Sequence, residues 1–151
     1  MLKIGDKAPD FKLQNDNDEM VSLKDLKGKN VVLYFYPKDD TPGCTKEACG
    51  FRDEIKAFSK KNVVIYGVSA DPIESHQKFK KKFSLSFPLL SDPSKEMIQA
   101  YGVWKEKSMY GKKYMGIERT TFIINETGKI TQIFPKVKVD GHIEEVLNLF
   151  K

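Results

Sequence analysis

The sequence predicts an α/β protein built on a mixed β-sheet with helices on its faces. Residues 31–36 and 63–69 are continuous apolar runs rich in β-branched and aromatic side chains, as expected of buried central strands. An amphipathic segment over residues 42–60 separates them, and a strand, a helix and a second strand in this order make the two strands parallel. Residues 120–124 and 129–134 flank the turn-forming sequence Asn-Glu-Thr-Gly, which predicts an antiparallel hairpin. Parallel and antiparallel strands therefore share one sheet.

Shorter patterns predict the other elements. In chain order these are an N-terminal hairpin within residues 11–26, a helix from Asp71 to about Ser84, an extended segment over 85–90, a short helix over 94–101 and a last helix after Gly141. The N-terminal hairpin is expected to cover one sheet edge. The last helix has apolar residues at helical spacing, namely Ile143, Val146, Leu147 and Phe150. We expect one domain over residues 1–151, because no linker, repeat or low-complexity tract interrupts the chain.

Composition narrows the function. The 151 residues contain no apolar run long enough to span a membrane, and the first residues lack the apolar region of a signal peptide, so we expect a cytoplasmic protein. The net charge of +5 is dispersed, and its one lysine run, residues 80–82, is expected to be a solvated helix face rather than a nucleic-acid site. Two cysteines are too few for a disulfide framework and indicate catalysis, redox sensing or metal binding.

Both cysteines lie at the start of the predicted helix over residues 42–60. Thr41 suits the N-cap and Pro42 the first helical position, which places Cys44 in the first turn. Free backbone N–H groups and the positive end of the helix dipole favour a thiolate there. Cys49 lies about 140° further round the helix, at a Cα separation of about 8.6 Å from Cys44. A disulfide tolerates at most about 7 Å, so pairing requires the first turns to unwind. We expect a helical reduced state and a locally unfolded disulfide state.

Pro37, Thr41 and Cys44 have the spacing P-x-x-x-T-x-x-C, which resembles the active-site signature of peroxiredoxins. The match extends to the bacterioferritin comigratory protein branch, also called peroxiredoxin Q, through five segments: YFYPK at 34–38, TPGCT at 41–45, EAC at 47–49, GVW at 102–104 and YMGIER at 114–119. The similarity covers nearly the whole chain from about Ile4. It implies a thioredoxin-like fold with an N-terminal β extension.

The resemblance also implies a mechanism. Cys44 attacks the peroxide and becomes a sulfenic acid, Cys49 resolves it as an intramolecular disulfide, and thioredoxin or a similar dithiol protein restores both thiols. Thr41 and Arg119 are expected to stabilise the reacting sulfur and oxygen. The resemblance implies no metal, haem or flavin. Hydrogen peroxide and organic hydroperoxides are the expected substrates, and resolution within one helix favours a monomer.

The resemblance places three more residues, Pro37, Gly43 and Glu47, at or beside the site, and Glu47 is expected to orient an arginine. Other candidates have ordinary structural interpretations. These are Arg52 paired locally with Asp53 or Glu47, His76 packed or half-exposed on a helix face, His142 at the surface, and Trp104 in the core or at the rim of the site.

Two other functions remain open from the residues alone. A disulfide oxidoreductase of the same fold is one, although such enzymes favour C-x-x-C and four residues separate these cysteines. A metal-binding or redox-sensing module is the other, although structural zinc takes four ligands and the chain has only two cysteines.

Overall fold

The computed structural model describes all residues from Met1 to Lys151. A seven-stranded mixed sheet in the order β2-β1-β5-β4-β3-β8-β9 forms its centre. The strands are β1 (Lys12–Asn15), β2 (Met20–Ser22), β3 (Asn30–Phe35), β4 (Val63–Ser69), β5 (Leu89–Ser91), β8 (Thr120–Ile124) and β9 (Ile130–Phe134). β3, β4 and β5 are parallel neighbours, whereas β8 and β9 continue the sheet antiparallel to β3. β1 and β2 extend the other edge, as the N-terminal hairpin prediction requires.

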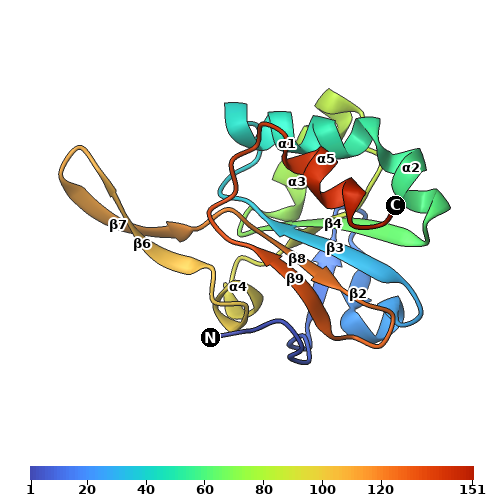
Figure 1. The fold of residues 1–151 in the computed structure, drawn as a ribbon. Helices are drawn as coiled ribbons and strands as arrows, with labels where there is room; N and C mark the ends of the chain where they lie inside the picture. The colour runs from blue at the N-terminus through green and yellow to red at the C-terminus, as the bar shows by residue number, and fades with distance from the viewer.

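Helices cover both faces of this sheet, as Figure 1 shows. The helical segments are η1 (Leu23–Leu26), α1 (Pro42–Asp53), α2 (Ile55–Lys60), α3 (Ile73–Phe83), α4 (Glu96–Ala100) and α5 (His142–Asn148). β3 separates two apolar clusters because its side chains alternate between the faces. Leu33 and Phe35 join η1 and α4 on one side, whereas Val32 and Tyr34 join α1, α2, α3 and α5 on the other. The sheet therefore holds α1, with its cysteines, against a fully buried aromatic layer.

The structure corrects several expected boundaries. The helix predicted over 42–60 is broken at Glu54, whose ψ of 9° lies outside the helical range and separates α1 from α2. The extended segment expected over 85–90 pairs with the sheet only at Leu89–Ser91, and the helix expected over 94–101 is confined to Glu96–Ala100. None of these differences changes the order of the elements.

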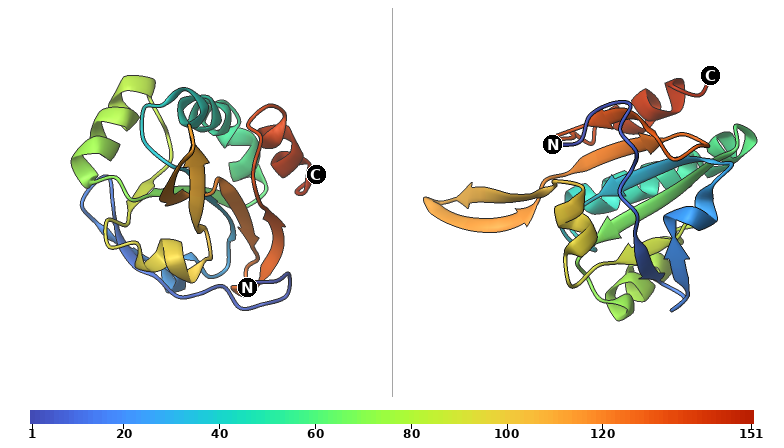
Figure 2. Two further views of the ribbon diagram at one scale, coloured as in Figure 1. Left: turned by 90° about the vertical axis from the view of Figure 1, so that its left-hand side faces the viewer. Right: turned by 90° about the horizontal axis from the view of Figure 1, so that it is seen from below.

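The sequence did not predict two elements. The expected N-terminal hairpin stops at Ser22, and the 3-10 helix η1 replaces its expected continuation to Leu26. The second is the hairpin of β6 (Trp104–Met109) and β7 (Lys112–Ile117). β6 and β7 pair only with each other and project from the body of the molecule, as Figure 1 and the right-hand view of Figure 2 show. Their polar side chains hide the strand signal, because an arm with two solvated faces lacks the alternation of apolar and polar residues.

None of the helices has the length and apolar character needed to cross a membrane.

Candidate active site

The site is built around the first turn of α1. The chain leaves β3, crosses the loop of residues 37–41 and enters the helix at Pro42, with Thr41 extended at φ −105° and ψ 155° in the N-cap position. The predicted N-cap is therefore confirmed in position, but the Thr41 side chain makes no capping hydrogen bond. Its hydroxyl donates to the carbonyl oxygen of Lys38 at 2.9 Å and so closes the loop on itself. The N–H groups of the first helical turn remain directed at the space in front of the helix.

Cys44 lies in this first turn, 2% exposed, as a free thiol. Arg119, which joins β7 to β8, reaches it from the other side of the site, and its Nη2 lies 3.2 Å from the Cys44 Sγ. Gly43 permits this approach, because a Cβ built at that position would lie 3.1 Å from the same Nη2. Seventy-five residues apart in sequence, the thiol and the guanidinium are thus in direct contact.

Glu47 holds the other branch of the Arg119 fork. Its Oε1 accepts a hydrogen bond from Arg119 Nη1 at 2.7 Å, whereas its Oε2 is buried without a partner. Burial raises the pKa of Glu47 to about 7, although the nearby positive charge of Arg119 opposes this shift. Burial lowers the pKa of Arg119, but Glu47 and Cys44 more than offset it, so that the pKa is raised overall. Arg119 is therefore a permanent cation held between a carboxyl and a sulfur.

Cys49 is also a free thiol, half-buried, and lies in the same unbroken helix as Cys44. The structure therefore presents the helical state that we expected for the reduced protein. Two glycines of α1, Gly43 and Gly50, leave room for side chains packed against the helix. Gly43 leaves room for Arg119, and Gly50 leaves room for α5. A Cβ at Gly50 would lie 2.9 Å from the Ile143 side chain.

Two aromatic residues, Tyr34 and Phe51, lie in the same apolar cluster as Cys44 on the core side of the site. Tyr34 stacks on Phe51 of α1 with ring centroids 4.9 Å apart, and its buried hydroxyl has no hydrogen-bond partner. Burial, followed by the negative charges of Glu47 and Cys44, raises the pKa of this hydroxyl well above its usual range. Tyr34 therefore stays neutral and shields the thiol from the core side.

Lys107 of β6 is a second cation near the site that the sequence analysis missed. Its aliphatic chain lies over Gly116, where a Cβ would come within 3.2 Å of the Lys107 Cδ. Burial and the charge of Arg119 lower the pKa of Lys107, while Cys44 acts in the opposite direction. Lys105 pairs with Gly116 across the two strands, so Lys107 is the diagonal neighbour of Gly116 on the same face. The sequence could suggest this packing only once the hairpin itself was recognised.

The two histidines are both buried, which agrees with one of the alternatives expected for His76 and contradicts the expectation for His142. The surface placement of His142 was wrong, because the residue is 3% exposed and its Nε2 lies 2.8 Å from the Thr121 hydroxyl. Burial lowers the pKa of His142, against the effect of Glu145. His76, expected to be packed or half-exposed, is fully buried.

Arg52 and Trp104 match their structural interpretations. Arg52 pairs with Asp53, as one of the two expected alternatives, and also donates to the carbonyl oxygen of Phe83. It does not pair with Glu47, which is engaged by Arg119. Trp104 is half-buried against the core, with the Lys95 ammonium 5.3 Å from its ring centroid.

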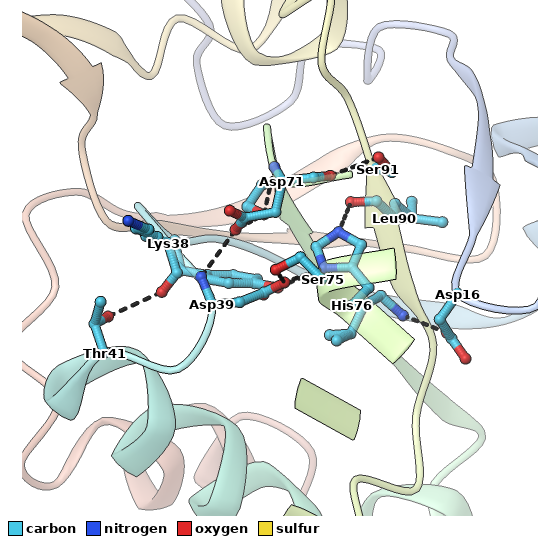
Figure 3. Close-up of polar contacts among 12 residues, drawn as sticks. Asp16, Lys38, Asp39, Thr41, Asp71, Ser75, His76, Leu90 and Ser91 are labelled. Carbon is cyan, nitrogen blue, oxygen red and sulfur yellow. Dashed lines mark hydrogen bonds and ion pairs between the residues drawn. The ribbon is translucent and has the colours of Figure 1, made fainter. Parts of the chain in front are cut away.

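Asp39, Asp71 and His76 are the one group of side chains close enough together to suggest a metal site, with their ligand atoms within 4.8 Å of one another. Hydrogen bonds within the protein already occupy them, as Figure 3 shows. Asp39 Oδ2 accepts from Ser75 and faces His76, and Asp71 Oδ2 accepts from Ser69 and from the Asp39 backbone. The donor set fits an internal network better than a cation site.

Comparison with known proteins decides the family. Residues 4–133 match the AhpC/TSA family. This chain belongs to the AhpC/TSA family. It is 58% identical to a putative Bcp peroxiredoxin of Coxiella burnetii, over 97% of each chain. It is 51% identical to the Bcp peroxiredoxin of Bacillus subtilis, over 99% of this chain and 96% of that protein.

Solved structures agree with this assignment. A cysteine-to-serine variant of Xylella fastidiosa PrxQ superposes with a TM-score of 0.94 at 39% identity, covering 99% of this chain and 95% of that one. A Xanthomonas campestris bacterioferritin comigratory protein superposes with a TM-score of 0.89 at 41% identity, covering 93% and 89%. The fold is the thioredoxin-like peroxiredoxin fold, and the chain is a thiol peroxidase of the Bcp and PrxQ type.

Proposed function

We propose that Cys44 is the peroxide-reacting sulfur and Cys49 the resolving one. The Cys44 thiolate attacks one oxygen of the peroxide, the O–O bond breaks, and the products are the Cys44 sulfenic acid and an alkoxide or hydroxide that takes up a proton. The Cys49 sulfur then attacks the sulfenic sulfur, forming a disulfide and releasing water. A dithiol reductant returns both cysteines to thiols and becomes oxidised itself.

The contact between Arg119 and Cys44 carries this proposal. A thiolate is the nucleophilic form of cysteine, and a guanidinium 3.2 Å away favours that form. As the O–O bond breaks, negative charge moves from sulfur to the departing oxygen. The same guanidinium and the free N–H groups of the first turn of α1 lie where they can stabilise this charge. The same groups can therefore stabilise negative charge first on the Cys44 sulfur and then on the departing oxygen.

The neighbouring residues have supporting roles. Thr41 offers hydroxyl lone pairs while its proton is donated to Lys38, and rotation about its side-chain bond would present that proton to peroxide. Pro37 ends the strand and has no N–H to satisfy in the exposed loop. Gly43 leaves room for the guanidinium, and Glu47 fixes its orientation through the second branch of the fork.

Resolution requires α1 to move. Since the two cysteines are five positions apart in a continuous helix, the first turns of α1 must unwind before the sulfurs meet. A thioredoxin-like dithiol protein is the proposed reductant and the cytosol the proposed compartment. Both cysteines belong to one helix, so the cycle needs no partner subunit, and we propose a monomer that folds as one unit over residues 1–151.

Hydrogen peroxide and organic hydroperoxides are the proposed substrates. The Xanthomonas campestris relative is described for alkyl peroxide reduction, which supports the organic class. The basic surplus of this chain is dispersed over its lysines, and nucleic acid has no part in the proposal.

The test is the intact mass of reduced protein before and after one equivalent of hydrogen peroxide, followed by peptide mapping. Loss of two hydrogens mapped to a Cys44–Cys49 link is the expected result. Two unreacted thiols would refute the proposal. A single oxygen added to Cys44 would support Cys44 as the nucleophile but show that Cys49 does not resolve it. Insulin reduction, measured in parallel, should be negligible if the chain is no general disulfide oxidoreductase.

A further inference from the structure

A buried polar cluster behind the loop of residues 37–41 has no part in the chemistry proposed above. We name it the loop clamp and define it as Asp39, Asp71, Ser75 and His76, which Figure 3 labels, together with Tyr36, whose hydroxyl donates to Asp39. The clamp joins the end of β3, the 37–41 loop, the end of β4 and the first turn of α3. Asp39, its central residue, is 6% exposed, and His76 is fully buried.

The hydrogen bonds of the clamp fix its proton count. His76 Nε2 lies 3.0 Å from the carbonyl oxygen of Leu90, which can only accept, so Nε2 carries a proton. His76 Nδ1 lies 2.7 Å from Asp39 Oδ2, and the contact requires one proton between them, on either the ring or the carboxyl. The pair therefore has no net charge, which suits a site without solvent.

Asp39 is held at every polar atom of its side chain and at its N–H. Oδ1 accepts from the Tyr36 hydroxyl, and Oδ2 also accepts from the Ser75 hydroxyl at 2.8 Å. The Asp39 backbone N–H donates to Asp71 Oδ2 at 2.8 Å. Satisfied networks of this kind are rigid, because each lost bond leaves a buried group unpaired.

The next residue shows that the loop is under constraint. Asp40 adopts φ 56°, in the left-handed region, which disfavours a Cβ although aspartate tolerates it better than most residues. Such a conformation persists where the surroundings hold it, and the clamp on Asp39 and the bond from Thr41 to Lys38 flank it. Thr41 and the first turn of α1 follow immediately, so the clamp sets the position from which the helix starts.

We propose that the Asp39–His76 pair is a positioning element that sets the balance between helical and unwound α1. With the clamp intact, the loop presents Thr41 and Cys44 in the peroxide-reactive arrangement. With the clamp weakened, the loop relaxes, oxidation of Cys44 slows and unwinding toward Cys49 becomes easier. The inference rests on the proposed roles of Cys44 and Cys49, and neither Asp39 nor His76 touches the reacting atoms.

The test measures two rates by rapid quenching, alkylation and mass spectrometry: oxidation of Cys44 by hydrogen peroxide and subsequent formation of the disulfide. Asp39→Ala removes the clamp, and the loss of its buried hydrogen bonds predicts oxidation slower by about tenfold. Disulfide formation should accelerate in the same variant, and over-oxidation of Cys44 at high peroxide should fall. Ser75→Ala removes a single donor and should shift both rates in the same directions by a smaller factor.

Two matched variants separate positioning from stability. Asp39→Asn retains an acceptor for Tyr36 and supplies an N–H to a neutral His76 Nδ1, so it should restore rates close to those of the wild type. Ile130→Ala makes a cavity in the apolar cluster on the opposite face of the sheet and should lower the unfolding midpoint without the opposed change in rates.

Three outcomes decide the matter. If Asp39→Ala and Ile130→Ala change the two rates alike, or if Asp39→Asn behaves as Asp39→Ala, the clamp is only a structural support and the inference fails. If wild-type Cys44 itself does not react, the proposed function fails instead. Opposed rate changes in Asp39→Ala, absent from Asp39→Asn and Ile130→Ala, support the inference.

Discussion

Replacing Glu47 by glutamine should remove a pH dependence of stability that originates in the active site. Burial raises the pKa of Glu47 from 4.5 to about 7, and each tenfold change in proton affinity corresponds to about 1.4 kcal/mol. The ionised carboxylate therefore costs the folded protein about 3 kcal/mol relative to the protonated one. Because the folded pKa is raised, this stability is fully present below pH 4.5 and is lost as the pH rises through 7. Between pH 5 and 8 the loss should be about 2 to 3 kcal/mol.

The assay is urea unfolding of the reduced protein at pH 5, 6, 7 and 8. Glu47→Gln keeps an acceptor for Arg119 but cannot ionise, so the wild type should lose stability relative to this variant across the range. Glu126→Gln, at an exposed carboxyl, is the control and should show a constant difference. A constant difference for Glu47→Gln as well would refute the reasoning. A wild type that gains stability with pH would mean that the ion pair with Arg119 outweighs burial.

Three further predictions concern the reaction itself. Arg119→Lys retains the charge but loses the planar fork, so single-turnover oxidation of Cys44 should slow by roughly ten- to a hundredfold; an unchanged rate would show that charge alone suffices. Gly43→Ala places a Cβ about 3.1 Å from Arg119 Nη2, so the same oxidation should slow by several-fold while the free energy of unfolding in urea stays within about 0.5 kcal/mol of the wild type; a stability loss without a rate change would contradict this. Cys49→Ser should leave Cys44 as a sulfenic or over-oxidised product in peptide maps, and a persisting disulfide cycle would exclude Cys49 as resolver.

The sequence was informative where the signal is local. The runs that form β3 and β4 are apolar over their whole length because both faces of these strands are covered, and α1 begins at Pro42 as its capping pattern predicts. The peroxiredoxin resemblance directed attention to Arg119, but the contact with Glu47 spans 72 residues and no local pattern specifies it. Only the register of β8 beside β3 brings the two segments together.

The errors share a physical cause. Histidine is a polar residue type that is often found at the surface. His142 is nevertheless buried, because the Glu145 carboxylate of α5 and the Thr121 hydroxyl of β8 provide a hydrogen-bond partner for each of its ring nitrogens. The hairpin of β6 and β7 was missed for the opposite reason: its side chains are mostly exposed, so the sequence has no periodic apolar pattern there. The partner that buries His142 against the sheet, Thr121, is distant in sequence, and the hairpin has no partner element at all.

The arrangement of the site also links proton uptake to the motion of α1. Arg119 is fixed at the start of a sheet strand, whereas Cys44 and Glu47 both belong to the helix that must unwind. Unwinding therefore breaks both contacts of the guanidinium and exposes a carboxyl whose pKa is about 7 in the folded site and 4.5 in water. Protonated Glu47 favours the helix, and its ionisation favours unwinding, so disulfide formation in the wild type should gain more from rising pH than in Glu47→Gln. Equal pH dependence in the two proteins would place Glu47 outside the moving segment.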